Sequence, residues 1–282
     1  MMKIATAEGT KTILAKYPFM MKKKYGQNFL IDSHVLSKII NAANITKTDS
    51  ILEIGPGIGS LTQELLEHAN EVIAVEIDKS LIPILDDQFG HFENFSLIND
   101  DILKLNLQDI LKDKSSIKVV ANLPYYITTP IIMDLLESNL PFVSIIVMVQ
   151  KEVADRIVAK PGTKDYGSIS ASIAYYAQTR IVANVPQHSF MPRPNVNSAV
   201  IELSLYKNPP VTLKNKELFF RVIKAAFSQR RKTILNTLAN NFDIDKSSIK
   251  EILDLANIAE NVRGETLSIM NFAVLANLIA ER

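Results

Sequence analysis

Short apolar runs alternate with longer amphipathic segments between residues 50 and 160. A continuous apolar run of strand length is typical of a parallel sheet that is covered by helices on both faces. The pattern therefore predicts an α/β fold with a doubly wound sheet. The predicted strands lie at residues 50–54, 72–76, 96–98, 118–121 and 144–149, with helices between them.

The pattern changes in the last third of the chain. Residues 173–185 are predicted to be partly helix and partly strand, and the alternation over residues 198–206 predicts a late antiparallel strand. Pro209 and Pro210 cannot continue a strand because proline has no N–H, and helical periodicity follows them to the end. We therefore expect an N-terminal extension (1–20) with a helix over residues 5–16, an α/β domain (21–207) and a small all-helical domain (208–282).

The composition restricts the function classes. The chain has 282 residues with 47% hydrophobic content and no cysteine, which excludes disulfides and thiolate metal sites. His34, His68, His91 and His188 lack the spacing of metal ligands, so we predict no metal. Residues 1–30 hold no apolar stretch of signal-peptide length, and the apolar run at 143–149 is too short to span a membrane. We expect a cytoplasmic protein without membrane association.

A glycine-rich turn follows the first predicted strand, with the sequence Gly55-Pro56-Gly57-Ile58-Gly59. Glycines let the backbone approach a ligand, and the start of the next helix offers free N–H groups. The spacing is GxGxG rather than GxGxxG, which favours an adenosyl cofactor over a dinucleotide. Glu76 ends the second strand and can accept hydrogen bonds from ribose hydroxyls, while Asp101 can accept from an adenine amine. The alternative is a tight turn with two solvated acids.

The tetrapeptide Asn122-Leu123-Pro124-Tyr125 follows another predicted strand. An amide and a backbone carbonyl can accept hydrogen bonds from an aromatic amine and so prepare its nitrogen for attack on a methyl group. Tyr125 can stack on the base, and Phe190, on a proline-rich loop, can close the other face of a flipped base. The alternatives are a packed tyrosine after an ordinary turn and a Phe190 that belongs to the core.

In this order, the segments resemble the ribosomal RNA adenine dimethyltransferase family. The resemblance covers residues 25–280 and is carried by the segments 26–30, 53–57, 75–78, 122–125, 190–198 and 227–232. It implies a Rossmann-like class I methyltransferase with a mostly parallel, doubly wound seven-stranded sheet and a small C-terminal all-helical domain. It further implies a monomer that uses S-adenosyl-L-methionine to dimethylate the N6 atoms of two adjacent adenosines in the 3′-terminal hairpin of 16S rRNA, in an immature small ribosomal subunit.

The resemblance also assigns roles to individual residues. Residues 28–30 would cover the cofactor, and Asn122 would touch both cofactor and target adenine. The catalytic residues would be Asn122, Leu123, Pro124, Tyr125 and Phe190. The cofactor contacts would be Asn28, Leu30, Gly55, Gly57, Glu76, Asp101 and Asn122.

The charge balance does not by itself indicate a nucleic-acid-binding protein, since the chain has 31 basic and 30 acidic residues. Local clusters matter more, because salt screens charges beyond about 10 Å. If residues 218–238 form one helix, Arg221, Lys224, Arg231 and Lys232 fall within an arc of about 100°. The alternative is a break of the helix at Ser228 and Gln229, after which the positive charge is still local. We predict that this surface contacts RNA phosphates; the alternative is a solvated helix face. The predicted RNA-binding residues are Lys22, Lys23, Lys24, Arg221, Lys224, Arg230, Arg231 and Lys232.

Three other functions remain open. The first is an adenine methyltransferase of 23S rRNA of the macrolide-resistance type, against which the glycine turn and the loop at 190–198 argue. The second is an adenine-specific DNA methyltransferase, which the lack of a recognisable target-recognition domain disfavours. The third is a non-catalytic ribosome assembly factor, which would have no need to keep Glu76, Asp101 and Asn122.

Overall fold

The computed structural model describes residues 2–17, 21–22 and 26–282. Lys23 and Lys24 lie outside the described residues. The contacts divide the chain into two compact units. Unit 1 comprises Met1–Ala154 and Thr179–Leu205, and unit 2 comprises Asp155–Gln178 and Tyr206–Arg282.

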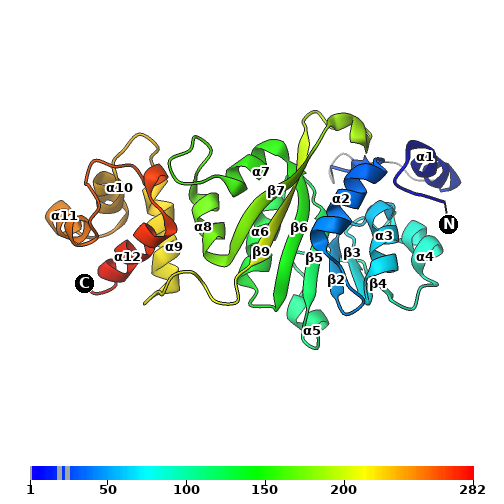
Figure 1. Ribbon diagram of the computed structural model, residues 1–282, viewed down its shortest axis with the longest axis horizontal. Coiled ribbons are helices and arrows are strands. Elements are labelled where there is room, and N and C mark those ends of the chain that lie inside the picture. Colours follow the sequence, from blue (N-terminus) through cyan, green and yellow to red (C-terminus); the bar gives the residue numbers. More distant parts are fainter. Residues whose placement is uncertain (1, 18–20, 23–25) are drawn as a thin grey trace. The chain divides into compact units, whose positions relative to one another are not determined.

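Unit 1 is built on one sheet of seven strands in the order β4-β3-β2-β5-β6-β9-β7 (Figure 1). The neighbouring pairs from β4 to β6 are parallel, whereas β9 is antiparallel to β6. The predicted mostly parallel, Rossmann-like sheet and its late antiparallel strand are confirmed. The strands are β2 (Ser50–Ile54), β3 (Glu71–Val75), β4 (Phe95–Ile98), β5 (Ile117–Asn122), β6 (Phe142–Gln150), β7 (Ala177–Val185) and β9 (Ser198–Leu205).

Burial explains why the strands read as continuous apolar runs. All five residues of β2 are buried, and neighbouring residues such as Ile51 and Leu52, which point to opposite faces, are both fully buried. The helices of unit 1 are α1 (Ala7–Lys16), α2 (Ser33–Ala43), α3 (Ser60–His68), α4 (Ile82–Phe89), α5 (Leu107–Leu111) and α6 (Thr128–Glu137). A further helix, α7 (Lys151–Val158), begins in unit 1 and ends in unit 2.

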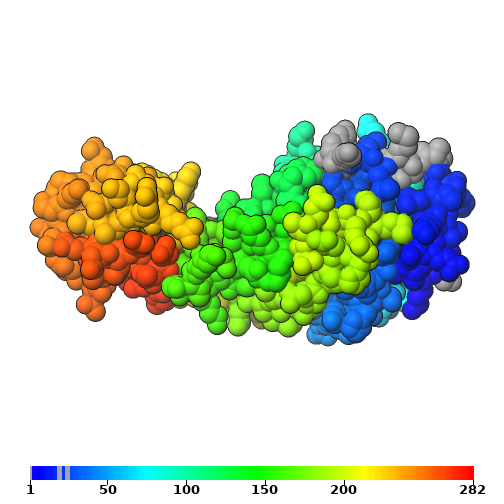
Figure 2. All heavy atoms as spheres, turned by 90° about the horizontal axis from the view of Figure 1, so that it is seen from above, coloured from blue at the N-terminus to red at the C-terminus, as the bar shows by residue number. Residues whose placement is uncertain are grey.

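The N-terminal residues are packed onto unit 1. The predicted helix is present as α1 and begins at Ala7, where the Thr6 side chain accepts a hydrogen bond from Gly9 N. Ile4, Ala5 and Ile13 are buried in the same core as the sheet. In Figure 2, the dark blue spheres show the surface that this segment contributes.

Unit 2 consists of helices around its own apolar core. In the space-filling view its residues after 210, coloured yellow to red, form one continuous body (Figure 2). Phe219 and Phe272 are fully buried there. The helices are α8 (Ser168–Tyr176), α9 (Lys216–Ala226), α10 (Ile234–Asn241), α11 (Lys246–Leu255) and α12 (Ile269–Ile279), with a 3-10 turn at Gly264–Thr266. No helix in the described part of the chain is long and apolar enough to cross a membrane.

The second unit is larger than the predicted helical domain. It includes Asp155–Gln178, which the sequence analysis assigned to the α/β domain. The reason is aromatic packing, because Tyr175 of α8 lies with its ring centroid 5.5 Å from that of Phe219 in α9. The other predicted boundary, between residues 207 and 208, falls close to the start of the second segment at Tyr206.

Residues 218–238 do not form one helix, and the alternative of a break near Ser228 and Gln229 is present. Helix α9 ends at Ala226, and Ser228 Oγ donates to the Ala225 carbonyl, 2.7 Å away. A new helix, α10, begins after Thr233, whose side chain accepts a hydrogen bond from Asn236 N. Hydroxyl side chains compete for backbone groups in this way and favour helix ends over helix interiors. The basic residues therefore do not form one continuous helical ridge.

Candidate active site

One cavity opens where three strands of unit 1 end. It has a volume of about 1080 Å³, including the part that is open to solvent. The lining comes from the turn after β2, the ends of β3 and β5, residues 26–30 and residues 100–102. Ligands of open α/β sheets bind at these carboxyl ends of the strands.

The glycine turn forms the floor of the cavity. Gly55, Gly57 and Gly59 have φ values of 68°, 62° and 88°, a region that other residues rarely adopt. A Cβ on Gly57 would lie 3.2 Å from the Phe29 ring, and one on Gly59 would lie 2.2 Å from the Phe89 ring. The second distance is below any real contact. The turn therefore needs glycine both for its backbone and for its close packing.

Glu76 lies directly after β3 and is buried, with 4% of its surface exposed. Its two carboxylate oxygens accept hydrogen bonds from Gly57 N at 3.2 Å and from Asp78 N at 2.8 Å. Burial raises the pKa of Glu76 to about 7 despite these backbone donors. An acid in this position can accept hydrogen bonds from ribose hydroxyls once it is ionised.

Glu53 is a site residue that the sequence analysis did not select. It lies in β2, lines the cavity and is 1% exposed, with Thr62 Oγ1 donating to its carboxylate at 2.7 Å. Burial, with a contribution from the charge of Glu76, raises the pKa of Glu53 to about 8. The available signal was a single acid within an otherwise apolar strand.

Asp101 lies beside Asp100 and Ile102 in the cavity wall. Its Oδ1 accepts a hydrogen bond from Leu103 N at 3.1 Å, and Lys104 Nζ lies 3.8 Å from Oδ2. The carboxylate thus shapes the loop after β4 while it keeps acceptor capacity toward the cavity.

Asn122 and the residues after it also line the cavity. Asn122 Nδ2 donates to the Asn28 carbonyl at 3.1 Å, which leaves Oδ1 as an acceptor. The Pro124 carbonyl already accepts from Ile127 N at 3.3 Å and from Thr128 Oγ1 at 3.1 Å. The Leu123 carbonyl accepts no hydrogen bond within the described residues, so it is the backbone oxygen that is available to a ligand.

Tyr125 lines the cavity and is half-buried. Its hydroxyl lies 2.7 Å from Ser198 Oγ, which fixes the ring relative to β9. Burial raises the pKa of the phenol. The next residue, Tyr126, also lines the cavity and is 55% exposed, so a second aromatic surface lies at the rim.

The position of Phe190 differs from the expectation that its ring closes one face of the base site. It belongs to β8 (Phe190–Met191), which pairs with β1 (Phe29–Leu30), and its partner in the register is Leu30. It is 3% exposed, lies in the core and is not among the lining residues. The ring is buried in the core cluster that also contains Leu30, so stacking on a base requires the ring to leave this position.

The basic residues predicted to bind RNA are divided between the two units. Lys22 forms an ion pair with Asp78 in unit 1. The remaining described ones belong to unit 2 and are all exposed, with the Arg221 guanidinium 5.1 Å from the centre of the Phe242 ring. They are Arg221, Lys224, Arg230, Arg231 and Lys232. The structure therefore gathers most of the predicted RNA-binding charge on the surface of unit 2.

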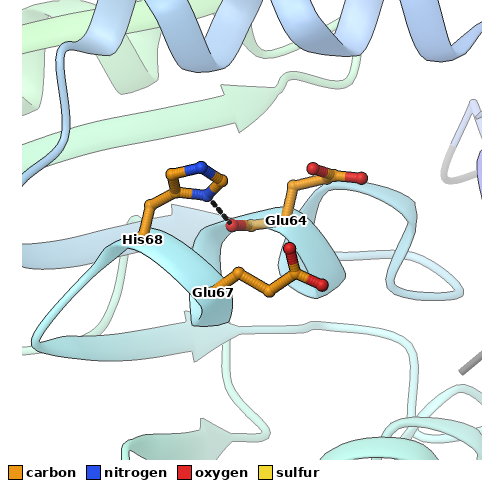
Figure 3. A group of neighbouring side chains, drawn as sticks. All are labelled: Glu64, Glu67 and His68. Carbon is orange, nitrogen blue, oxygen red and sulfur yellow. Dashed lines mark hydrogen bonds between the residues drawn. The ribbon is translucent and has the colours of Figure 1, made fainter.

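One group of three possible metal ligands occurs among the described residues, Glu64, Glu67 and His68 (Figure 3). All three belong to α3, and His68 Nδ1 donates to the Glu64 carbonyl at 2.8 Å. Glu67 and His68 are exposed. Exposed acids on one helix are common without a metal, so we assign no metal-dependent role to this group.

Unit 1 combines a Rossmann-like sheet and a glycine turn with an acid after β3 and, at the end of β5, two acceptors for an adenine amine. These features define a class I methyltransferase that uses S-adenosyl-L-methionine. The profile of the ribosomal RNA adenine dimethylase family matches residues 19–274, and the chain belongs to this family of enzymes. The chain is 54% identical over 279 residues to ribosomal RNA small subunit methyltransferase A of Lachnoclostridium phytofermentans, covering 97% of this chain and 96% of that protein. It is 50% identical to the protein of the same name from Clostridioides difficile, covering 98% of this chain and 97% of that protein.

Solved structures agree with the fold. A dimethyladenosine transferase from Plasmodium falciparum superimposes with a TM-score of 0.75 at 27% identity, covering 87% of this chain and 95% of that one. The 23S rRNA methyltransferase ErmE superimposes with a TM-score of 0.70, covering 90% of this chain and 100% of that one. At 23% identity, the second likeness shows the fold alone.

Proposed function

We propose that this enzyme dimethylates the N6 atoms of two adjacent adenosines in the 3′-terminal hairpin of 16S rRNA, within an immature small ribosomal subunit. The observation that carries the proposal is that the glycine turn, Glu76, Asn122 and Tyr125 line the same cavity. Relatives at about half identity are named small subunit methyltransferases, which supports the choice of RNA. We further propose that the enzyme acts in the cytoplasm as a monomer.

The cofactor fits the residues that the cavity offers. Gly55 has no atom within 4 Å of the position where a Cβ would stand, which leaves space for a ligand beside the turn. Glu76 would hold the ribose hydroxyls, and Asp101 would accept from the adenine amine of the cofactor. When bound, S-adenosyl-L-methionine supplies a methyl group on a positively charged sulfur. Asn28 and Leu30 line the same cavity and would contact the cofactor from the side of residues 26–30.

The target amine needs help because its lone pair is delocalised into the purine ring. Asn122 Oδ1 and the Leu123 carbonyl would accept one hydrogen bond each from its two N–H groups, which favours a pyramidal nitrogen with its lone pair directed at the methyl group. Pro124 fixes the bend that holds these two acceptors. No strong base is required, because the amine becomes acidic once it is methylated and its proton passes to water.

Aromatic contacts would hold the flipped adenine. Tyr125 would stack on the base, a contact worth roughly 1–3 kcal/mol. Phe190 would cover the second face only after its ring leaves the core, so we assign it a role in the RNA-bound state. Arg221, Lys224 and residues 230–232 would contact RNA phosphates from the exposed surface of unit 2.

Two other functions make different predictions. A 23S rRNA methyltransferase would label the large subunit, and a non-catalytic assembly factor would bind RNA without transferring methyl groups. The test is incubation of the protein with labelled cofactor and each purified ribosomal subunit from cells that lack the enzyme. We expect label in 16S rRNA alone.

The matched variant is Asn122→Ala. It should bind RNA as the wild type does but transfer methyl groups at least about a hundredfold more slowly, since it lacks an acceptor used in the transition state. A Lys16→Met variant, altered at an exposed ion pair on α1, serves as a control with unchanged rate. Label in 23S rRNA, or full activity of Asn122→Ala, would contradict the proposal.

A further inference from the structure

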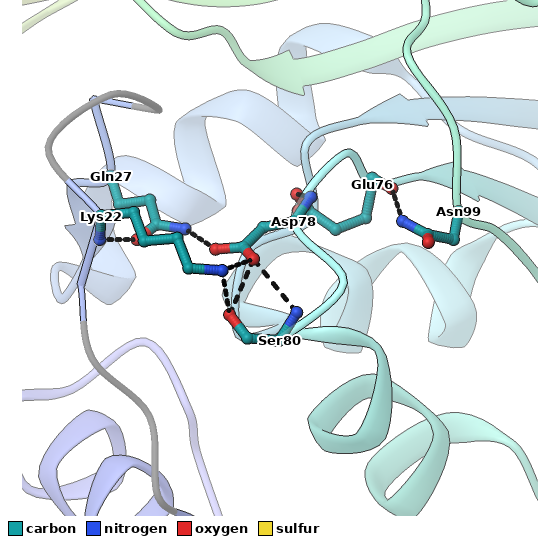
Figure 4. A network of polar contacts seen from close by, with 6 residues as sticks. All are labelled: Lys22, Gln27, Glu76, Asp78, Ser80 and Asn99. Carbon is teal, nitrogen blue, oxygen red and sulfur yellow. Dashed lines mark hydrogen bonds and ion pairs between the residues drawn. The ribbon is translucent and has the colours of Figure 1, made fainter.

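A cluster of polar contacts lies beside the cavity, between the segment that precedes β1 and the loop after β3 (Figure 4). Its centre is the Asp78 carboxylate, whose side chain is 1% exposed. Lys22 Nζ lies 2.6 Å from Oδ1, and Gln27 Nε2 donates to Oδ2 at 2.7 Å. Ser80 donates to Oδ1 through both its N–H, at 3.0 Å, and its hydroxyl, at 2.7 Å.

The Asp78 carboxylate is ionised at neutral pH. Burial alone would raise the pKa of Asp78, but the hydrogen bonds from Lys22, Ser80 and Gln27 outweigh it and lower the pKa. A buried carboxylate with a full set of donors holds its partners in one geometry. Lys22 and Gln27 are also joined directly, since Lys22 N donates to Gln27 Oε1 at 2.8 Å.

The segment that Gln27 belongs to contacts both halves of the active site. Residues 26–30 all line the cavity. On the cofactor side, the Phe29 ring packs so closely on Gly57 that a Cβ there would lie 3.2 Å away. On the target side, the Asn28 carbonyl accepts the hydrogen bond from Asn122 Nδ2. A displacement of this segment would therefore alter both walls.

We propose that Lys22 and Asp78 are positioning residues, which hold residues 26–30 against the cavity before the cofactor arrives. The inference rests on the cofactor site described above. Neither residue lines the cavity itself, so both act through Gln27. Fixing the backbone of one flexible residue lowers a binding constant by roughly a factor of 5 to 30. Because the cluster fixes the segment before the cofactor binds, the cofactor affinity does not carry this loss.

This role differs from the phosphate contact that the sequence predicted for Lys22. An RNA contact would affect the affinity for RNA and its salt dependence. A positioning role would affect the affinity for the cofactor in the absence of RNA. The two roles therefore separate in one pair of measurements.

The experiment uses Lys22→Met, because an Asp78 variant would also change the pKa of Glu76, which the charge of Asp78 helps to raise. Binding of S-adenosyl-L-homocysteine is measured by calorimetry without RNA, so the result does not depend on which RNA is methylated. We expect binding to be on the order of tenfold weaker in Lys22→Met and restored to within about twofold in Lys22→Arg. At saturating cofactor, kcat should remain within about threefold of wild type, because the bound cofactor then orders the segment.

The control is Lys16→Met, which removes an exposed ion pair of the same 2.6 Å length that does not line the cavity. Its cofactor affinity should equal that of the wild type, and the melting temperature of every variant is recorded to detect unfolding. The proposal is overturned if Lys22→Met binds S-adenosyl-L-homocysteine within twofold of wild type. It is also overturned if the variant instead binds RNA more weakly with a flatter salt dependence.

Discussion

Cofactor binding should weaken as the pH falls through 7, because Glu76 must be ionised to accept hydrogen bonds from two ribose hydroxyls. Burial raises the pKa of this carboxyl to about 7 in the free protein, against the effect of the Asp78 and Gly57 N–H groups. Hydroxyl donors favour the ionised form, so the bound state has a lower pKa. Binding below pH 7 therefore releases a proton.

The size of the effect follows from the linkage of one proton. Below the pKa of the free protein, affinity falls by about tenfold for each pH unit. With a pKa of about 7, the dissociation constant should thus be about tenfold larger at pH 6 than at pH 8.

The raised pKa of Glu76 also affects the stability of the free protein, but stability falls with rising pH whereas cofactor affinity increases. The folded-state pKa lies above the ordinary value of 4.5, so the folded protein binds more protons than the unfolded chain between these values. Stability should therefore fall as the pH rises from 4.5 to about 7 and change little from this group above that. The full shift corresponds to about 3 kcal/mol as an upper bound.

The assay is calorimetric titration with S-adenosyl-L-homocysteine between pH 6 and pH 8, in two buffers with different ionisation enthalpies. The difference between the buffers gives the number of protons released. Glu76→Gln should bind weakly at every pH and release no proton from this site. Binding of the wild type that is independent of pH would refute the reasoning about Glu76.

Two further predictions concern the glycine turn and the RNA surface. Gly59→Ala should lower the free energy of unfolding by about 1–3 kcal/mol more than Gly55→Ala, because its Cβ would collide with Phe89 whereas Gly55 has open space, and equal losses in urea titrations would contradict this. Charge reversal of Arg231 and Lys232 should weaken RNA binding and flatten its salt dependence while leaving calorimetric cofactor affinity unchanged, and an unchanged salt slope would count against an RNA contact.

The sheet and both walls of the cavity could be predicted because their signals are local. A strand buried on both faces reads as an apolar run, and β2 lies at the predicted residues 50–54. The glycine turn and Asn122 follow such strands directly, so the parallel topology alone brings them to one edge.

The features that could not be predicted depend on contacts between distant residues. Lys22 meets Asp78 across 56 positions, and a run of lysines gives no sign of a buried partner. Phe190 pairs with Leu30, 160 positions away, and is buried in the same core, neither of which the proline-rich loop revealed. The end of α9 is an exception, because Ser228 and Gln229 marked a possible break in the sequence; the cap at Thr233 was not identified.

The most direct test of the proposed function is mass spectrometry of 16S rRNA from cells with and without this protein. The account predicts two methyl groups on the N6 atom of each of two adjacent adenosines near the 3′ end, present only in cells that make the enzyme. Identical 16S rRNA in both cells, together with a methylated adenine that disappears from 23S rRNA or DNA, would contradict it.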